Sequence, residues 1–235
     1  MTTRSEPATT ERRAPLTRDR VLRAAIDLAD REGIEAVSMR RLGQELGVEA
    51  MSLYNHVANK EDVLDGVVDL IVGEIGPASV EGDWKAAVRG RILSARRAML
   101  RHPWASTVIT SRIQPSPVMM KYMDSVGGMM LAGGFSVDLM HHAFHTLGSR
   151  VLGFSQELFD DSSEMDQSPE MQALLLSQMR AEYPSITAIV EQISHDDATV
   201  VGSGCDDQFE FEFALDLMLD GLERLRLRET SAATT

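Results

Sequence analysis

The sequence contains a single cysteine, Cys205, so one chain cannot form an internal disulfide. This excludes the small secreted scaffolds that disulfides hold together, and it favours a reducing, cytoplasmic location. Long apolar runs are missing as well. No window approaches the roughly eighteen apolar residues of a membrane-spanning helix, and residues 1–15 lack the apolar run of a signal peptide. We therefore expect a cytoplasmic protein without a membrane partner.

Aromatic residues are scarce, at 5% of the chain, whereas there are 14 methionines. The hydrophobic content of 43% is enough to build a core, which excludes a disordered chain. A length of 235 residues suits one small and one larger domain. Because methionine side chains are flexible, this composition fits a helical core that contains adaptable space.

Positive charge is in short supply, because 23 lysine and arginine residues stand against 36 acidic ones, a net charge of −13. This balance argues against a protein that coats nucleic acid with its whole surface. The charge is unevenly distributed, however. Residues 1–60 hold ten basic and nine acidic residues, net +1, which leaves thirteen basic and twenty-seven acidic residues, net −14, for residues 61–235. Only the N-terminal part is spared repulsion from phosphate.

The periodic segments all fit helices, and no stretch shows sustained alternation of apolar and polar residues. Helix starts are marked by capping residues or by proline, at Thr17, Ser38, Asn59, Asp83, Pro103, Ser116, Ser136, Ser168, Pro184 and Asp206 or Asp207. We predict an all-α fold with two domains. The expected divisions are a disordered arm at 1–15, a helix-turn-helix domain at 16–62 whose last helix continues to 75, a larger helical domain at 76–228 and a disordered tail at 229–235.

Residues 38–60 have the pattern of two short helices joined by a tight turn at Gly47. Leu42 and Leu46 form an apolar stripe before the turn, and Leu53 faces inward after it. A second helix of about eight residues is not stable alone, so its neighbours must hold it while its polar side faces outward. These properties are those of a helix-turn-helix, whose second helix enters the major groove of DNA.

An ordered set of residues in this block carries a further resemblance: Gly33-Ile34, Leu42-Gly43, Leu46-Gly47-Val48, Ser52-Leu53-Tyr54, His56-Val57, Asn59-Lys60 and Leu64. With these residues the chain resembles the tetracycline-repressor (TetR) family of bacterial transcription regulators. The resemblance implies a regulator rather than an enzyme. It implies a homodimer that binds a double-stranded, pseudo-palindromic DNA operator, and we expect a repressor that a small, largely apolar effector releases.

The outward-facing side chains of the segment 38–60 are the expected operator contacts. They are Arg40, Glu49, Ala50, Met51, Ser52, Tyr54, Asn55, His56 and Lys60. The family resemblance implies that Tyr54, His56 and Lys60 mainly contact phosphates, which fixes register without reading sequence. A second basic group lies in the arm and the first helix, at Arg12, Arg13, Arg18, Arg20 and Arg23. It is either a set of phosphate contacts or an ordinary solvated face.

Two helices of the larger domain contain heptad-spaced apolar residues, which predicts a four-helix bundle between two protomers. The expected interface residues are Met140, Leu147, Val151, Phe154, Phe211, Leu215, Met218, Leu222 and Leu225. The alternative is that these side chains pack on the protomer's own core. The last helix carries more apolar surface than one contact covers, because Phe209, Phe213, Leu217 and Leu219 lie on its other faces.

Aromatic, methionine and histidine side chains from several helices of the larger domain are the expected lining of an effector cavity. They are Trp104, Tyr122, Met123, Phe144, His145, Met171 and Leu175. The alternative is an ordinary packed core.

Metal binding has little support in the sequence. His141, His142 and His145 share one helix, and His141 and His145 have the four-residue spacing that can hold zinc, but no cysteine or further ligand follows at a recognisable spacing. The alternatives for this cluster are a polar contact that lines a cavity and ordinary satisfied or surface histidines. Gly134-Phe135-Ser136 and Leu147-Gly148 resemble the tetracycline repressors themselves, which bind tetracycline with Mg²⁺. The positions that correspond to their metal-binding residues are Thr110 and Leu152, neither of which is a metal ligand. We therefore expect no metal and no cofactor, and an effector other than tetracycline with Mg²⁺.

Two other classes of function remain open at this point. One is an all-α enzyme or small-molecule-binding protein with an appended helical N-terminus, which would not bind DNA sequence-specifically. The sequence has no ordered Ser/His/Asp set, no phosphate-binding glycine loop and no HExxH motif, which argues against an enzyme. The other is a constitutive DNA-binding protein, whose DNA affinity no small molecule would change.

Overall fold

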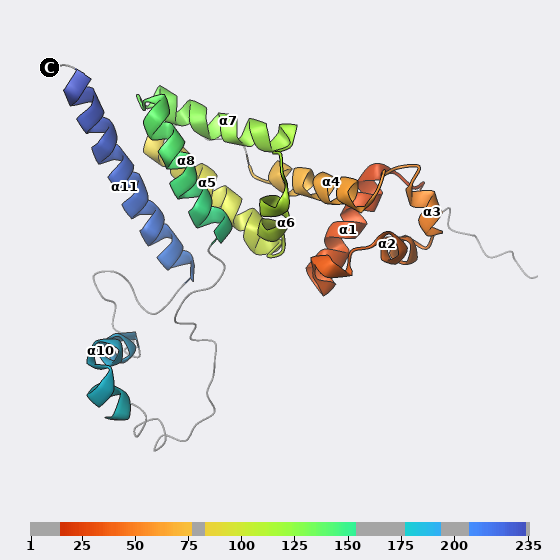
Figure 1. The fold of residues 1–235 in the computed structure, drawn as a ribbon, viewed down its shortest axis with the longest axis horizontal. Coiled ribbons are helices and arrows are strands. Elements are labelled where there is room, and N and C mark those ends of the chain that lie inside the picture. Colours follow the sequence, from red (N-terminus) through yellow and green to blue (C-terminus); the bar gives the residue numbers. More distant parts are fainter. Residues whose placement is uncertain (1–14, 77–82, 154–176, 194–206, 234–235) are drawn as a thin grey trace, which may run out of the picture. The chain divides into compact units, whose positions relative to one another are not determined.

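The computed structural model describes residues 15–76, 83–153, 177–193 and 207–233. Every secondary-structure element in these ranges is a helix (Figure 1), which confirms the predicted all-α fold. The chain separates into two compact units. The N-terminal unit comprises Met1–Gly76 and Arg97–Met123, and the C-terminal unit comprises Pro77–Arg96 and Asp124–Thr235. The sequence predicts a single cut near 76, whereas the structure groups residues 97–123 with the helix-turn-helix.

Helix α1 (Arg18–Glu32) braces the N-terminal unit. The hydroxyl of Thr17 accepts a hydrogen bond from the backbone N–H of Arg20 at 3.2 Å, and the helix ends at Gly33, whose φ of +86° suits glycine. A short 3₁₀ helix, η1 (Ile34–Ala36), follows and is too short to leave a periodic signal. One side of α1 is buried in the unit, through Val21, Leu22, Ala24, Ala25, Ile26, Leu28 and Ala29.

Helices α2 (Met39–Leu46) and α3 (Ala50–Leu53) form the predicted helix-turn-helix. The turn between them contains Gly47 in the left-handed conformation, with φ +64° and ψ 40°. A Cβ at Gly43 would lie 2.9 Å from the carbonyl oxygen of Val48, so the close approach of the two helices needs glycine here. The turn geometry is therefore set by glycines that the sequence already marked.

Helix α3 is shorter than the sequence predicts, with four residues in place of about eight. After Leu53 the backbone N–H groups of His56 and Val57 both donate to the carbonyl of Leu53, at 2.8 and 3.0 Å. These two hydrogen bonds close a tight turn, and the helix does not continue beyond Leu53. The residues after Leu53 therefore form a compact loop that leads into the next helix.

Helix α4 (Lys60–Gly73) starts at Asn59, whose side-chain oxygen accepts the N–H of Asp62 at 2.9 Å. It packs against α1 and against helix α6 (Ala105–Ser111). This explains why residues beyond 96 belong to the N-terminal unit: α6 covers part of α4. The buried face of α4 consists of Val63, Leu64, Gly66, Val67, Val68, Ile71 and Val72.

The C-terminal unit is built from parts of α5 (Trp84–Arg101) and α7 (Pro117–Ala132), with α8 (Val137–Gly153) and α11 (Asp207–Ala233). Helices α8 and α11 pack against each other. The predicted caps are confirmed, because Asp83, Ser116 and Ser136 each accept a backbone N–H three residues ahead, at 2.8, 3.1 and 3.0 Å.

Two glycines of this unit mark close packing. A Cβ at Gly127 would lie 3.2 Å from the sulfur of Met140 on α8, so α7 and α8 approach closely at this point. A Cβ at Gly133 would lie 2.5 Å from the Trp84 side chain, whose ring packs edge-on against Phe135 with centroids 4.5 Å apart. Nothing in the structure explains the neighbouring Gly128, at which a Cβ would meet no atom within 4 Å.

Charged pairs join α5 to α11. Arg89 contacts Asp216 through Nε and Oδ1 and Glu212 through Nη2 and Oε2, both at 2.7 Å, and Lys85 pairs with Asp220. Hydrogen bonds from Gln208 and then from Arg89 lower the pKa of Glu212 below its ordinary value. Part of the strong negative charge of residues 61–235 is therefore balanced inside the unit.

Some predicted boundaries need correction or lie outside the described residues. The last helix is predicted to end near 228, but α11 continues to Ala233 through the expected disordered tail. Helix α10 (Pro184–Ile193) starts at the predicted proline. The arm at 1–14, Phe154, Met171, Leu175 and the predicted loop at 195–206 lie outside the description. Of the helices described, none has the length and apolar character needed to cross a membrane.

Candidate nucleic-acid interface

The predicted operator contacts lie at the surface of the N-terminal unit, around α2 and α3. Leu53 is fully buried and Val57 is nearly so, which holds α3 and the following loop to the unit from the inside. On the outside Met51 is 74% exposed and Tyr54 is 46% exposed. The exposed members of the predicted set are Arg40, Glu49, Met51, Tyr54 and Asn55, and the half-buried ones are Ala50, Ser52, His56 and Lys60. All remain accessible, while their contact with DNA stays a prediction.

Ion pairs fix α2 against α1. Arg31 contacts Glu45 at 2.7 Å, and Arg41 contacts Glu32 at 2.6 Å, so each helix contributes one arginine and one glutamate. Within the described ranges Arg40 forms no ion pair, although it is next to Arg41 in sequence. Its exposed guanidinium is therefore available for a planar, two-bond contact with a base or phosphate.

The arginines of the second basic group, in the arm and the first helix, differ in their surroundings. Arg18 is bonded to Asp62, with Nη2–Oδ1 at 2.6 Å and Nη1–Oδ2 at 2.8 Å. Arg23 pairs with Asp19 at 2.8 Å within α1. Arg12 and Arg13 lie outside the described residues. The sequence does not reveal the bond between Arg18 and Asp62, because no local pattern links residues 44 positions apart.

This helix-turn-helix agrees with family models that together cover most of the chain. Residues 21–67 match the model of bacterial regulatory proteins of the tetR family, and residues 76–226 match the model of the tetracyclin repressor-like C-terminal domain. The chain belongs to the TetR family. TetR-family proteins are DNA-binding transcription regulators rather than enzymes.

Named relatives give the same assignment. The HTH-type transcriptional repressor DrrR1 of Streptomyces coeruleorubidus is 32% identical over 219 residues, which cover 89% of this chain and 78% of that protein. An HTH-type transcriptional regulator of Saccharopolyspora erythraea is 36% identical over 121 residues, and this match spans about half of either protein. The crystal structure of the TetR family protein ActR from Streptomyces coelicolor in complex with actinorhodin aligns with a TM-score of 0.68 and 27% identity. That alignment covers 91% of this chain and 99% of ActR.

In this TetR-family chain the predicted effector residues are divided between the two units. Trp104, Tyr122 and Met123 belong to the N-terminal unit, whereas Phe144 and His145 are on α8 of the C-terminal unit. Trp104 is buried and donates its indole N–H to Asp30 of α1, whereas Met123 and His145 are exposed. The described residues therefore do not form one cavity lining within either unit, and the effector site remains a proposal.

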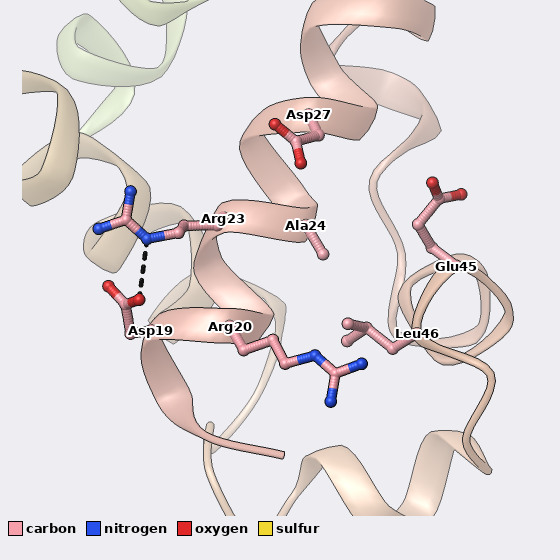
Figure 2. Close-up of a pocket in the computed structure, with 7 residues that line it drawn as sticks. All are labelled: Asp19, Arg20, Arg23, Ala24, Asp27, Glu45 and Leu46. Atoms are coloured by element: carbon pink, nitrogen blue, oxygen red, sulfur yellow. Dashed lines mark hydrogen bonds and ion pairs between the residues drawn. The ribbon is translucent and has the colours of Figure 1, made fainter. Parts of the chain in front are cut away.

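A pocket of about 390 Å³ lies between α1 and α2 instead. Figure 2 shows its lining, in which Asp19, Arg20, Arg23, Ala24 and Asp27 come from α1, and Glu45 and Leu46 come from α2. Charges of both signs surround it, which does not suit a largely apolar molecule. This pocket is thus not the effector cavity that the sequence predicts, and none of the predicted effector residues lines it.

The predicted dimer seam needs correction. Leu147, Phe211, Leu215 and Leu222 are all buried within the C-terminal unit of a single protomer. Arg96 and Arg150 lie over the ring of Phe211, at 4.2 and 5.0 Å from its centroid. These apolar side chains therefore face the protomer's own core, the alternative that the sequence left open.

Other apolar side chains of α11 are exposed at the surface of the protomer. Phe209 is 37% exposed, Phe213 43% and Leu217 58%, and the rings of the two phenylalanines stack with centroids 6.3 Å apart. Of the predicted seam, Leu225 is exposed and Met140, Val151 and Met218 are half-buried. The spacing of Phe209, Phe213 and Leu217 places them on one side of the helix. Leu219, which the sequence grouped with them, is instead fully buried in the protomer's own core.

The histidines of α8 are exposed and close together, with the ring centroids of His141 and His145 4.7 Å apart. His142 lies next to them, with its ring centroid 5.4 Å from that of His141. Among the described side chains no three histidine, cysteine or carboxylate groups are arranged to hold a metal ion. The cluster therefore provides a polar, accessible face of α8.

Proposed function

We propose that this TetR-family regulator is a homodimeric repressor that binds a pseudo-palindromic operator and leaves it when a small, largely apolar effector binds. The main support for DNA binding at this surface is the solvent exposure of the side chains around α3. A four-residue helix with one fully buried leucine presents Met51 and Tyr54 to solvent on a turn fixed by glycine. Such a short helix contributes little to the core, so we infer that its function lies in its exposed side chains.

Within this surface the roles divide by position. Arg40, Glu49, Ala50 and Met51 stand on α2 and at the start of α3, where the second helix of a helix-turn-helix approaches base edges. Tyr54, His56 and Lys60 follow in the loop and at the first position of α4, and we assign them to phosphates. The N-terminus of α4 adds a favourable dipole for a phosphate next to Lys60.

A dimer supports this function, because two reading heads on two half-sites bind jointly and more tightly than one. We place the interface on the exposed faces of α8 and α11. Phe209, Phe213 and Leu217 supply its apolar part, and the histidine face of α8 supplies accessible polar groups. Burial of these aromatic rings against a second copy would remove an exposed apolar strip from water.

The effector is proposed from the relatives and from composition. ActR was crystallised with actinorhodin, and DrrR1 carries the name of a repressor. Half-buried Phe144 and the 14 methionines of this chain suit an adaptable, mostly apolar site. An effector acts only when it binds the free and the operator-bound states unequally.

The test has two steps. A duplex is first selected by the purified protein from a random DNA library, and binding to it is measured by fluorescence anisotropy. Apolar polycyclic compounds that raise the melting temperature of the protein are then added to the complex. We expect a palindromic duplex and at least one compound that lowers its affinity. Selection of no preferred duplex contradicts operator binding, and stabilising compounds that leave DNA affinity unchanged favour the constitutive DNA-binding alternative.

A further inference from the structure

Arg18 is the first residue of α1 and bonds both to the loop that precedes α4 and to Asp62 in the first turn of α4. Its guanidinium donates to both carboxylate oxygens of Asp62 at 2.6 and 2.8 Å. The same group donates to the backbone carbonyl oxygens of His56 at 3.4 Å and Asp62 at 3.3 Å. A planar guanidinium held by two parallel bonds has a fixed orientation. Arg18 therefore joins the start of one helix to a loop about 40 residues away.

Asp62 lies in the first turn of α4 and bonds back to the same loop. Its Oδ2 also accepts the backbone N–H of Ala58 at 2.7 Å, and its own N–H donates to the side chain of Asn59 at 2.9 Å. The hydrogen bond from Arg18, followed by that from Ala58, holds the pKa of Asp62 below its ordinary value. The carboxylate thus stays ionised at neutral pH while it ties down the backbone between His56 and α4.

Packing leaves room for this arrangement at one position of α4. A Cβ at Gly66 would lie 3.2 Å from Nη2 of Arg18 and 2.7 Å from the methyl groups of Leu22. Any larger residue would displace the guanidinium or the leucine. The absence of a side chain at Gly66 therefore lets the α1 side chains lie against α4 and reach the loop.

We propose that Arg18 positions the phosphate-contacting loop of the operator-binding surface and is not itself a phosphate contact. This rests on the proposed contacts of Tyr54, His56 and Lys60. The loop between α3 and α4 is fixed from inside by buried Leu53 and from outside by the bonds of Arg18 and Asp62.

The accessibility of the Arg18–Asp62 ion pair indicates that it orients the loop more than it stabilises the fold. Arg18 and Asp62 keep side-chain exposures of 45% and 28%, and ion pairs this accessible contribute little to folding. What the pair provides is a single conformation of a loop whose side chains must match the spacing of phosphates. A phosphate could bind Arg18 only by competing with a carboxylate that already takes both of its parallel bonds.

The decisive variants are Arg18→Gln, Asp62→Asn and the two combined. A phosphate-contacting arginine predicts opposite effects, because Asp62→Asn would remove a negative charge near DNA, release Arg18 and strengthen binding. Positioning predicts that both single variants bind a duplex selected by the wild-type protein about tenfold more weakly. It also predicts that the double variant loses less affinity than the sum of the two single losses, because both changes disrupt the paired bonds between Arg18 and Asp62.

Two matched controls separate geometry from charge. Arg23→Gln removes one cation from the same helix, where Arg23 pairs with Asp19 within α1. Glu61→Gln removes one carboxylate from the first turn of α4, next to Asp62, and its partner is Arg112. We expect Arg23→Gln to change the affinity for the duplex by less than about threefold. Glu61→Gln should leave this affinity equal or slightly higher.

Affinity is measured by fluorescence anisotropy over a series of salt concentrations, with helix content and melting temperature recorded for each variant. Loss of affinity in both single variants, with retained helix content and a non-additive double variant, supports positioning. Stronger binding by Asp62→Asn, or unchanged binding by Arg18→Gln, overturns it. Lys60→Ala is included in the same series: if it leaves affinity and salt slope unchanged, the proposed loop contacts fail, whichever way the Arg18 and Asp62 variants behave.

Discussion

Trp104 donates its indole N–H to Oδ1 of Asp30 at 2.7 Å, which joins the residue just before α6 to the last part of α1. Nδ1 of His102 lies 2.9 Å from the same oxygen. Nε2 of His102 is 3.5 Å from Glu74, which also contacts Arg101 at 2.6 Å. One carboxylate on α1 and one at the end of α4 therefore hold the turn between α5 and α6 to these two helices of the N-terminal unit.

Replacement of Asp30 by Ala removes the acceptor of two side chains that are at most 9% exposed, Trp104 and His102. Because a buried donor is left unsatisfied, we expect the free energy of unfolding to fall by about 1–3 kcal/mol. Urea denaturation followed by tryptophan fluorescence measures this loss. Asp27→Ala is the control, one helical turn earlier and exposed at the open pocket, and we expect a change within about 0.5 kcal/mol. Equal effects of the two variants would contradict the role of Asp30.

Lys60 and Arg40 should respond differently when each is replaced by Ala. A phosphate contact carries no sequence information, so Lys60→Ala should weaken binding to all duplexes alike and reduce the salt slope by about 1. Arg40→Ala should relax the preference at one base position and cost about 1–3 kcal/mol on the selected duplex. Anisotropy titrations against the selected duplex and single-base variants measure both effects. Lys121→Ala, an exposed lysine of α7, should leave both properties unchanged.

The dimer interface predicts a difference between neighbouring residues of α11. Phe213→Glu places a charge on an exposed side chain, so the protomer should keep its fold while the dimer dissociates. Leu215 is fully buried, and Leu215→Ala should lower the free energy of unfolding by about 2–5 kcal/mol. Sedimentation velocity at micromolar concentration measures the first effect and denaturation the second. Ile113→Glu, at a residue 98% exposed in the N-terminal unit, is the control. A Phe213→Glu protein that sediments as the wild-type dimer rules out this surface.

Acid should weaken the contribution of Asp62 to stability. Its pKa is lower in the folded protein than in the unfolded chain, because Arg18 and then Ala58 bond to the carboxylate. The stabilisation is therefore fully present above the ordinary aspartate pKa of about 3.9, and it is lost as the pH falls through the lowered pKa. This accessible pair gives only a small difference in free energy of unfolding between wild type and Asp62→Asn, and that difference should shrink as the pH falls below about 4. A difference that grows with acidity would contradict this sign.

Local features of the chain could be predicted because they depend on neighbours in sequence. The caps Thr17, Ser38, Asn59, Asp83 and Ser136 each bond to an N–H three residues ahead, so residue type and position suffice to identify them. The outward residues around α3 follow for the same reason. A turn at Gly47 and one buried leucine decide which side chains face solvent.

Contacts between distant segments could not be predicted in this way. The sequence places Trp104 in an effector cavity, but its N–H reaches Asp30, 74 residues away. Arg18 likewise finds Asp62 across 44 residues, and no spacing rule connects such pairs.

The last helix shows the same division most clearly. Its sequence alone determined an α-helix with apolar residues on more than one side, because helical spacing follows from residue type. Only the tertiary structure decided that Leu215 enters the core while Leu217 stays exposed. Both are leucines on the same helix, and the difference comes from which side of α11 meets α8 and α5. Burial is set by the partner that a surface meets, and a periodic pattern does not name that partner.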